Sequence, residues 1–414
     1  MLDQSQTLSN RPTSGEAPFP IKDVFFSRTD TSGIIEAFNG AFSSVADYPP
    51  SDLLRAPHKI LRHPDMPKAV FWLMWDAINA GRPFGAYVKN RARDGLHFWV
   101  FAVVIPVDGG YVSVHLKPTS DLLPMVETLY GDLVKKEHEN NLDPEESAAR
   151  LNDALKSHGF SGHDQFQAEA LMRETKLRDV ALKRSEDRQI TGLSEIVQSL
   201  REMRKSKSEL GTHFEAVKAI PNNLRIMASR IEPSGGPITA ISANYKSMSE
   251  DVVQQLHDFS SDKRQNKGVP SNLDVDGLFN MCGSRLMQDV IAQLESEGTQ
   301  PEGIDCAGES QRLRDLDQTC RLGAETALKQ IVEQVQTISQ EAEELRRMVV
   351  GLDSIRVMCR VESGRMGHQY EGLVSIIENL DKFHSLIDQK LKEVGTKAQL
   401  INKDAEHLSR TWVI

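Results

Sequence analysis

The stretch from residue 84 to residue 116, FGAYVKNRARDGLHFWVFAVVIPVDGGYVSVHL, decides the fold that this sequence predicts. It contains three runs rich in β-branched and aromatic residues, which favour strands. Arg93-Asp94-Gly95 and Asp108-Gly109-Gly110 separate the runs and are typical of tight turns. The stretch therefore predicts an antiparallel meander with strands over 84–90, 97–105 and 111–116.

Shorter elements upstream complete a mixed α/β domain. Residues 24–26 begin a strand, 31–33 form a turn and 34–38 return, which predicts a hairpin. A short helix is expected over 39–46 and a longer one over 66–80, where apolar residues recur at helical spacing. Because an antiparallel sheet needs at least one covered face, we expect an α+β fold: a five-stranded antiparallel sheet with helices on one face.

The chain beyond residue 120 is rich in Glu, Gln, Lys and Leu and predicts long helices. One apolar series repeats with spacings of three and four, which indicates left-handed coiled-coil packing: Leu328, Ile331, Val335, Ile338, Ala342, Leu345, Val349 and Leu352. A second series runs from Leu373 through Ile376 and Leu380 to Trp412. We therefore expect long antiparallel helices in a four-helix bundle, formed within one chain or by a homodimer.

These patterns divide the chain into four parts. We expect a disordered tail over 1–20, the α+β domain over 21–119 and a helical connector over 120–186. The helical bundle is expected over 187–414, with hairpins about 190–262 and 310–412 and turns near 232–237 and 363–367.

Composition and missing motifs exclude several classes of function. The 414 residues carry a net charge of −10, which gives no general attraction to nucleic acid or anionic lipid. No apolar run is long enough to span a bilayer, and the N-terminal residues lack the features of a signal peptide, so we expect a cytoplasmic protein. The four cysteines have no metal-site spacing. There is no P-loop, GxGxxG, GxSxG or HExxH, so we do not expect an enzyme.

The segment HKILRHPDMP (58–67) concentrates polar residues just before an apolar helix. In a purely structural interpretation, Asp65 caps that helix and Pro67 begins its first turn. Together with FWLMWDAINAGRPF (71–84) and VKNRARDGLHFWV (88–100), the segment resembles the PAS domain of bacterial aerotaxis receptors. The resemblance covers about residues 24–118.

The resemblance implies a non-covalently bound FAD whose redox state is sensed. Arg62 is expected to supply a cation for the pyrophosphate and Asn90 an amide for the flavin ring edge. Phe84 stands where the family usually has a tryptophan. The residues that match the family's FAD-associated positions are Asn39, Arg62, His63, Asp65, Trp75, Phe84 and Asn90. Haem held by His63 ranks lower, and a cofactor-free PAS domain that only binds proteins stays open.

The helical half resembles, in degenerate form, the cytoplasmic signalling region of methyl-accepting chemotaxis proteins. Glu362 and Arg365 keep that family's Glu-x-x-Arg spacing at the hairpin tip. The resemblance implies contact with the chemotaxis kinase and its coupling protein. The alternative is a simple exposed ion pair of spacing i,i+3. The sequence thus predicts a soluble redox or oxygen sensor with flavin input and helical output, with a cofactor-free scaffold protein as the alternative.

Overall fold

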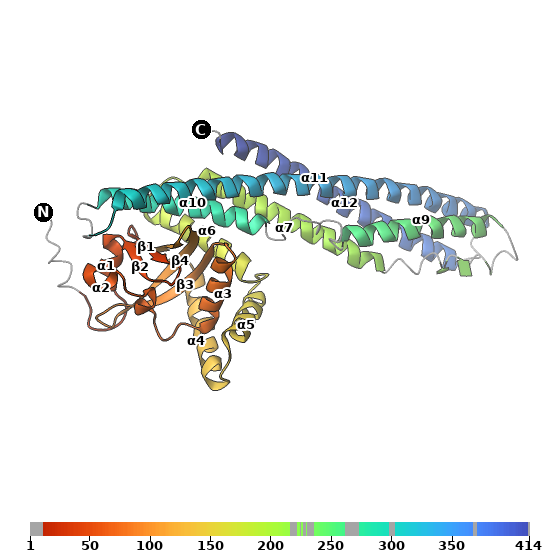
Figure 1. Ribbon diagram of the computed structural model, residues 1–414. Coiled ribbons are helices and arrows are strands. Elements are labelled where there is room, and N and C mark those ends of the chain that lie inside the picture. Colours follow the sequence, from red (N-terminus) through yellow and green to blue (C-terminus); the bar gives the residue numbers. More distant parts are fainter. Residues whose placement is uncertain are drawn as a thin grey trace. The chain divides into compact units, whose positions relative to one another are not determined.

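The computed structural model describes residues 11–215, 222–223, 225–226, 229, 236–260, 273–297, 303–366 and 371–412. The chain forms two compact units (Figure 1). Unit 1 comprises Met1–Thr191 and Asp274–Ala327, and unit 2 comprises Gly192–Leu273 and Leu328–Ile414.

The five-stranded antiparallel sheet predicted from the sequence is confirmed in unit 1. Its strands are β1 (Val24–Asp30), β2 (Ile35–Phe38), β3 (Phe84–Arg91), β4 (His97–Val107) and β5 (Gly110–Leu116). They lie in the order β2-β1-β5-β4-β3, and every neighbouring pair is antiparallel. A Cβ atom on Gly110 would lie 1.9 Å from the carbonyl oxygen of Thr29, so the tight return into β5 requires glycine.

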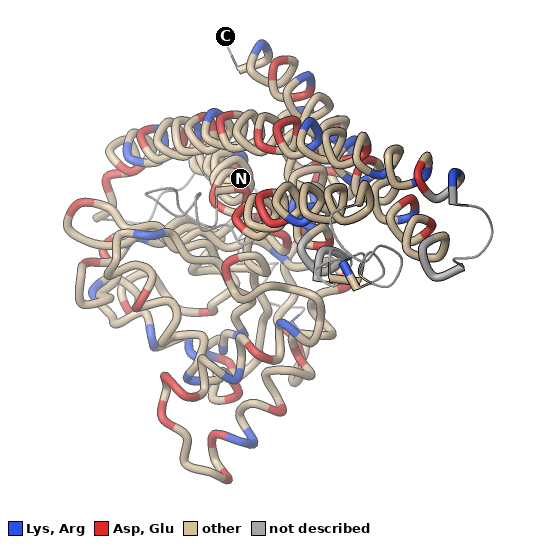
Figure 2. Tube along the Cα trace, turned by 90° about the vertical axis from the view of Figure 1, so that its right-hand side faces the viewer, with Lys and Arg blue, Asp and Glu red and all other residues tan. Residues whose placement is uncertain are grey.

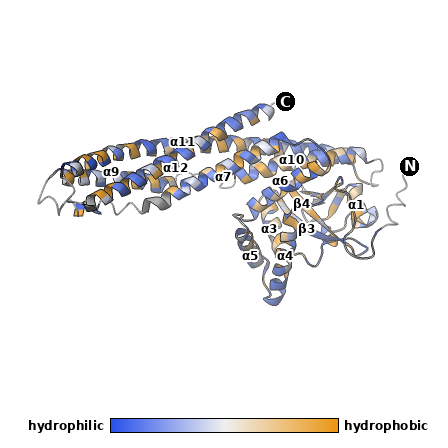
Figure 3. Ribbon diagram, turned by 180° about the vertical axis from the view of Figure 1, so that it is seen from behind, coloured by the Kyte–Doolittle hydropathy of each residue, from blue (hydrophilic) through white to orange (hydrophobic). Residues whose placement is uncertain are grey.

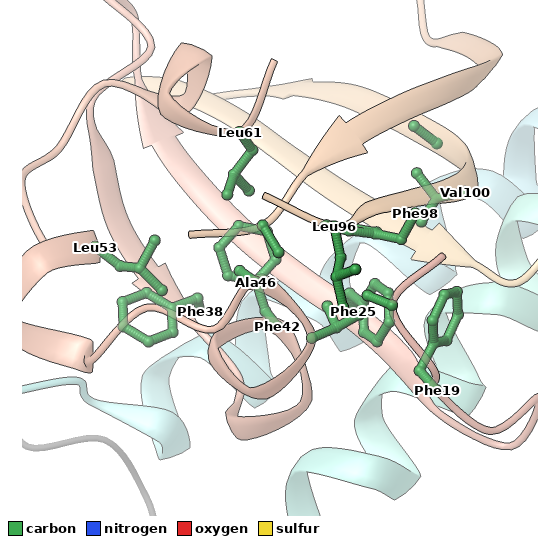
Figure 4. Packing of buried hydrophobic residues seen from close by; sticks show 14 of the residues in the cluster. Phe19, Phe25, Phe38, Phe42, Ala46, Leu53, Leu61, Leu96, Phe98 and Val100 are labelled. Carbon is green, nitrogen blue, oxygen red and sulfur yellow. The ribbon is translucent and has the colours of Figure 1, made fainter. Parts of the chain in front are cut away.

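Four short helical segments between β2 and β3 cover one face of this sheet. They are α1 (Gly40–Ala46), α2 (Pro50–Leu53), the 3-10 helix η3 (His58–Leu61) and α3 (Lys68–Asn79). Beneath α1 and α2, apolar side chains from the sheet and the helices form one cluster (Figure 4). Phe38 and Phe42 lie 5.9 Å apart between ring centroids, and Phe98 packs edge-on against Phe25 at 6.4 Å. This cluster fixes the short helices on the sheet.

Part of the segment expected to be a disordered tail is packed against the domain instead. The Ala17 amide donates to the His97 carbonyl at 2.7 Å, and the Phe19 ring lies 4.9 Å from the Phe25 ring. Both Ala17 and Phe19 are buried. The physical reason is their apolar side chains, which fill the end of the sheet; residues 1–10 of the expected tail lie outside the described residues.

Helices from later in the chain cover the second face of the sheet, which the sequence did not predict. Unit 1 continues with α4 (Leu122–Glu139), α5 (Pro144–Ser157) and α6 (His163–Ala181), and α10 (Leu273–Ser296) joins it. Figure 1 shows α6 and α10 beside the strands. The Phe279 ring of α10 lies against the backbone of Gly85, where an added Cβ would be 2.8 Å from it. The sheet is therefore buried on both faces.

Unit 2 contains the long helices predicted from the apolar repeats. These are α7 (Arg188–Glu215), α9 (Pro237–Ser260), α11 (Cys306–Met366) and α12 (Glu371–Trp412); the first residues of α7 and α11 belong to unit 1. Every member of the predicted series from Leu328 to Leu352 is buried. In α12 the predicted seam residue Ile376 is only partly buried, and its neighbour Ile377 is buried instead. Ile377 is therefore the residue that faces the seam at this turn of the helix. Figure 3 shows hydrophobic and hydrophilic residues interleaved along these helices.

Ion pairs join the helices of unit 2. Lys397 of α12 contacts Glu202 of α7 at 2.9 Å, and Arg346 of α11 contacts Asp388 of α12 at the same distance. Figure 2 shows both signs of charge distributed along the helices. The predicted turns fall partly outside the described residues, which omit 231–235 and 367–370. Among the helices that are described, none combines the length and apolar character needed to cross a membrane.

Candidate functional site

A pocket of about 580 Å³ lies between the sheet and the segment that carries η3 and α3. This volume falls in the ordinary range for small-molecule and cofactor sites. Its walls are mostly apolar, with side chains of α3 on one side and of β3 and β4 on the other: Val70, Phe71, Met74, Trp75, Phe84, Val88, Ala102 and Val104. The alternation of the strands explains this wall, since every second residue of β3 and β4 points to the same face.

The mouth of the pocket is cationic. Lys59 and Arg62 line it, and none of the described residues that line the pocket is Asp or Glu. The Arg62 guanidinium lies 3.8 Å above the Phe71 ring, which is a cation–π geometry. Partial burial lowers the pKa of Arg62, but an arginine stays protonated at neutral pH. The mouth therefore favours a ligand with an anionic group.

The inner end of the pocket is polar and uncharged. His58 and His115 line it, with their ring centroids 6.0 Å apart. His115 Nε2 lies 2.7 Å from the Ser113 hydroxyl, and His58 Nε2 lies 3.3 Å from the Ser27 hydroxyl. Burial lowers the pKa of His58 to about 4 and that of His115 to about 3, so both rings are neutral at pH 7. Neutral imidazoles at this end can exchange hydrogen bonds with a ligand.

Four of the seven predicted cofactor residues line this pocket. They are Arg62, Trp75, Phe84 and Asn90. An antiparallel bridge between Arg62 and Asn90 brings the mouth cation next to the buried amide of β3. Trp75 is 37% exposed and packs edge-on against Tyr111. Arg62 directly follows η3, Trp75 lies on α3, and Phe84 and Asn90 lie on β3, which explains why residues up to 28 positions apart meet at one site.

The other three predicted residues do not line the pocket. Asn39 is fully buried, where its Oδ1 accepts from the Phe26 amide at 3.0 Å. His63 Nδ1 accepts from the Asp65 amide at 3.1 Å, and the Asp65 carboxylate pairs with Lys89 at 2.7 Å. The expected cap of α3 by Asp65 is therefore not made, because Lys89 binds that carboxylate instead.

Sequence reasoning missed the two histidines and Phe71. The signal for His115 was present: in YVSVHL, Ser113 and His115 alternate with apolar residues. In a strand buried on both sides, such alternation indicates a polar patch on one face. His58 stands inside the quoted HKILRHPDMP segment, but only its position on η3 turns it toward the sheet.

The predicted partner-binding pair lies near the end of α11 in unit 2. Arg365 contacts Glu362 at 2.7 Å with spacing i,i+3, and the Arg365 side chain is 72% exposed. An exposed pair of this kind stabilises a helix by only a few tenths of a kcal/mol. Its exposure leaves Arg365 accessible to a partner.

Comparison with known proteins supports the same domain. A protein-family model described as "PAS fold" matches residues 35–115. The chain is 36% identical over 133 residues to the protein named "Aerotaxis receptor" of Escherichia coli (strain K12). That alignment covers 30% of this chain and 26% of the relative. The chain thus carries a PAS region similar to part of a receptor, which supports a role in signal transduction.

Proposed function

We propose that the protein is a redox or oxygen sensor whose PAS pocket binds FAD and whose helical region passes the signal to a protein partner. The observation that supports this most is the pocket of about 580 Å³, which combines an apolar slot, a cationic mouth and a buried amide. A flavin adenine dinucleotide offers the complementary parts: a flat apolar ring with polar edges, and an anionic pyrophosphate.

Four residues would hold the cofactor in this proposal. Phe84 and Trp75 would flank the flavin ring, Asn90 would hydrogen-bond its edge, and Arg62 would bind the pyrophosphate. When bound, a flavin accepts and returns electrons, which changes the charge and hydrogen bonding of its ring. Asn90 suits that change because an amide both donates and accepts, and His58 and His115 add neutral partners at the inner end.

An absorption spectrum of the purified full-length protein tests the input. We expect a yellow protein whose flavin bands bleach on reduction with dithionite. Arg62→Ala should weaken FAD binding at least about tenfold, because a charged hydrogen bond contributes roughly 1.5–3 kcal/mol. Arg91→Ala, on an exposed neighbouring residue of β3, is the matched control. A colourless protein that takes up no added FAD would reject the flavin and favour the cofactor-free scaffold.

The output is tested separately. We propose that Glu362 and Arg365 contribute to binding the chemotaxis kinase or its coupling protein. Capture of purified coupling protein by the wild type should fall after Glu362→Lys or Arg365→Glu. Glu344→Lys, an equal charge change on an exposed residue of α11, should leave capture unchanged. Failure of the wild type to capture either protein would remove this partner from the proposal.

A further inference from the structure

Three carboxylates, one on α4, one on α6 and one directly after α10, accept backbone N–H groups at or just before the start of other helices. Glu297 binds the Gly40 amide of α1 at 2.8 Å, and Glu174 binds the Thr119 amide just before α4 at 2.6 Å. Glu137 of α4 does the same for α3. Because α3 forms one wall of the pocket, Glu137 is, of these three carboxylates, the one that contacts a pocket-lining helix and can respond to a bound ligand.

Glu137 joins three helices at one buried point. Its Oε1 accepts from the Lys68 amide at 2.8 Å, from the Ala69 amide at 3.4 Å and from the Ser147 hydroxyl of α5 at 2.5 Å. The residue is only 5% exposed. One oxygen of α4 thus ties the start of α3 to α5.

Helix α3 depends on this contact because its own sequence supplies no cap. Its N-cap residue is Pro67, which makes no side-chain hydrogen bond to the helix. The first amides of a helix need acceptors, and a negative charge there is stabilised by the helix dipole. Asp65, the nearest acid in sequence, is engaged by Lys89. Glu137 therefore fixes the position of the pocket-lining helix.

The Glu137 carboxylate also interacts electrostatically with Arg62 at the mouth of the pocket. Burial lowers the pKa of Arg62, and the negative charge of Glu137 acts in the opposite direction, so the two groups attract each other. Arg62 also rests on Phe71, one turn into α3. A negative charge brought to Arg62 from inside the pocket offsets part of the positive potential that Glu137 experiences.

We propose that Glu137 transmits the charge state of the pocket to the α4–α5 hairpin. This inference rests on the proposed function, since it needs a ligand whose charge changes in the pocket. The bridge between Arg62 and Asn90 brings the flavin ring edge close to Arg62, so a negative charge added to the ring acts on Arg62 and through it on Glu137. The hold of Glu137 on the α3 amides and on Ser147 then weakens, and α5 loosens. The hairpin is thus the first output element of the PAS domain.

Hydrogen exchange on the full-length protein at low salt tests the tie itself. Glu137→Gln keeps the shape and removes the charge, and it should raise amide exchange in α5 and in the first turn of α3 about tenfold. Ser147→Ala leaves the α3 contact in place and should raise exchange in α5 alone. Glu139→Gln, on an exposed residue two positions along α4, should change neither. Unchanged exchange in both test variants would overturn the proposal.

A mutant cycle tests the link to the pocket without any cofactor. We expect the melting-temperature losses of Arg62→Met and Glu137→Gln to be non-additive, because each removes the charge that the other attracts. With FAD added, dithionite reduction should raise exchange in α5 of the wild type and not of Glu137→Gln. A protein that binds no FAD but shows non-additivity would reject the flavin and keep the Glu137–Arg62 link. Additive losses, or equal redox responses in both proteins, would overturn the link while leaving flavin binding intact.

Discussion

The buried carboxylate of Glu174 on α6 offers the most demanding test of how this unit is held together. Its Oε1 accepts from the Tyr87 hydroxyl at 2.7 Å and from the Ser120 hydroxyl at 2.6 Å. Its Oε2 accepts from the Thr119 amide at 2.6 Å. Glu174 has no exposed surface, and burial raises the pKa of Tyr87, so that hydroxyl remains a donor. The contact joins β3 and the chain after β5 to α6.

The expected losses follow from which donors lose their acceptor. Glu174→Ala leaves the part-buried amide of Thr119 and the buried amide of Ser120 without that acceptor. An unsatisfied buried donor costs about 1–3 kcal/mol, so we expect a loss of about 4 kcal/mol for the two together. Glu174→Gln keeps one oxygen for these amides, and the two hydroxyls can reverse to accept. Only the charge is lost, which costs about 1–2 kcal/mol. Tyr87→Phe removes a single hydrogen bond and should cost about 1.5 kcal/mol.

Tryptophan fluorescence during urea or thermal unfolding measures these losses. Trp72, Trp75 and Trp99 belong to unit 1 and only Trp412 to unit 2, so the signal follows unit 1. For a unit of this size, a loss of about 4 kcal/mol lowers the melting temperature by about 10 °C. Tyr111→Phe is the control, because its exposed hydroxyl makes one 3.3 Å contact with Asn79.

The test depends on how the variants rank by their loss of unfolding free energy. We expect Glu174→Ala to lose most, Glu174→Gln and Tyr87→Phe to lose less, and Tyr111→Phe to lose under about 0.5 kcal/mol. If Glu174→Ala were no more harmful than Glu174→Gln, the orphaned amides would not set the cost. If Tyr87→Phe matched the control, β3 would not depend on α6 through this carboxylate.

Three further outcomes are expected. Burial lowers the pKa of His115 to about 3, so between pH 6.5 and 3 the unfolded chain binds a proton there that the folded chain does not. The free energy of unfolding therefore decreases as the pH is lowered. His115→Gln should remove about 2 kcal/mol of the loss measured in urea between pH 7.5 and 5.0. Gly85→Ala should cost about 1–3 kcal/mol because its Cβ meets the Phe279 ring, whereas Gly131→Ala in open space should be neutral or stabilising, and equal melting temperatures for the two would contradict this packing. Burial raises the pKa of Cys320 to about 12, so this thiol should react with a disulfide reagent only after unfolding.

The sequence predicted the strands well because local signals specify them. The turns at Gly95 and Gly109 have positive φ angles, as the tight-turn sequences require. The apolar seam through Ile331 and Val335 could be predicted equally well, since its spacing of three and four residues is set within one helix. These elements depend on neighbours in sequence, so their pattern can be recognised without the tertiary fold.

Contacts between distant segments could not be predicted in this way. Asn39 was assigned to the cofactor by resemblance, yet its amide contacts Glu297, directly after α10, at 3.2 Å and 258 residues along the chain. The docking of Phe279 on Gly85 leaves no periodic trace in either segment. The pocket was anticipated at Arg62 and Asn90, where a motif marks it, and missed at His58 and His115, where only the tertiary fold brings the rings together.

Three buried carboxylates extend the folded domain beyond the segment that the PAS model matches. The PAS match covers residues 35–115, but Glu137, Glu174 and Glu297 all lie beyond it. Each satisfies backbone donors that the matched segment and its immediate exit leave open, and an unsatisfied buried donor costs about 1–3 kcal/mol. Since these costs are large beside a typical folding stability of about 5–15 kcal/mol, the matched segment alone is not the stable unit. Glu137 of α4 binds the start of α3, Glu174 of α6 binds β3, and Glu297 after α10 binds the start of α1. A change in the pocket that shifts α1, α3 or β3 therefore also shifts the helix that carries or precedes the bound carboxylate.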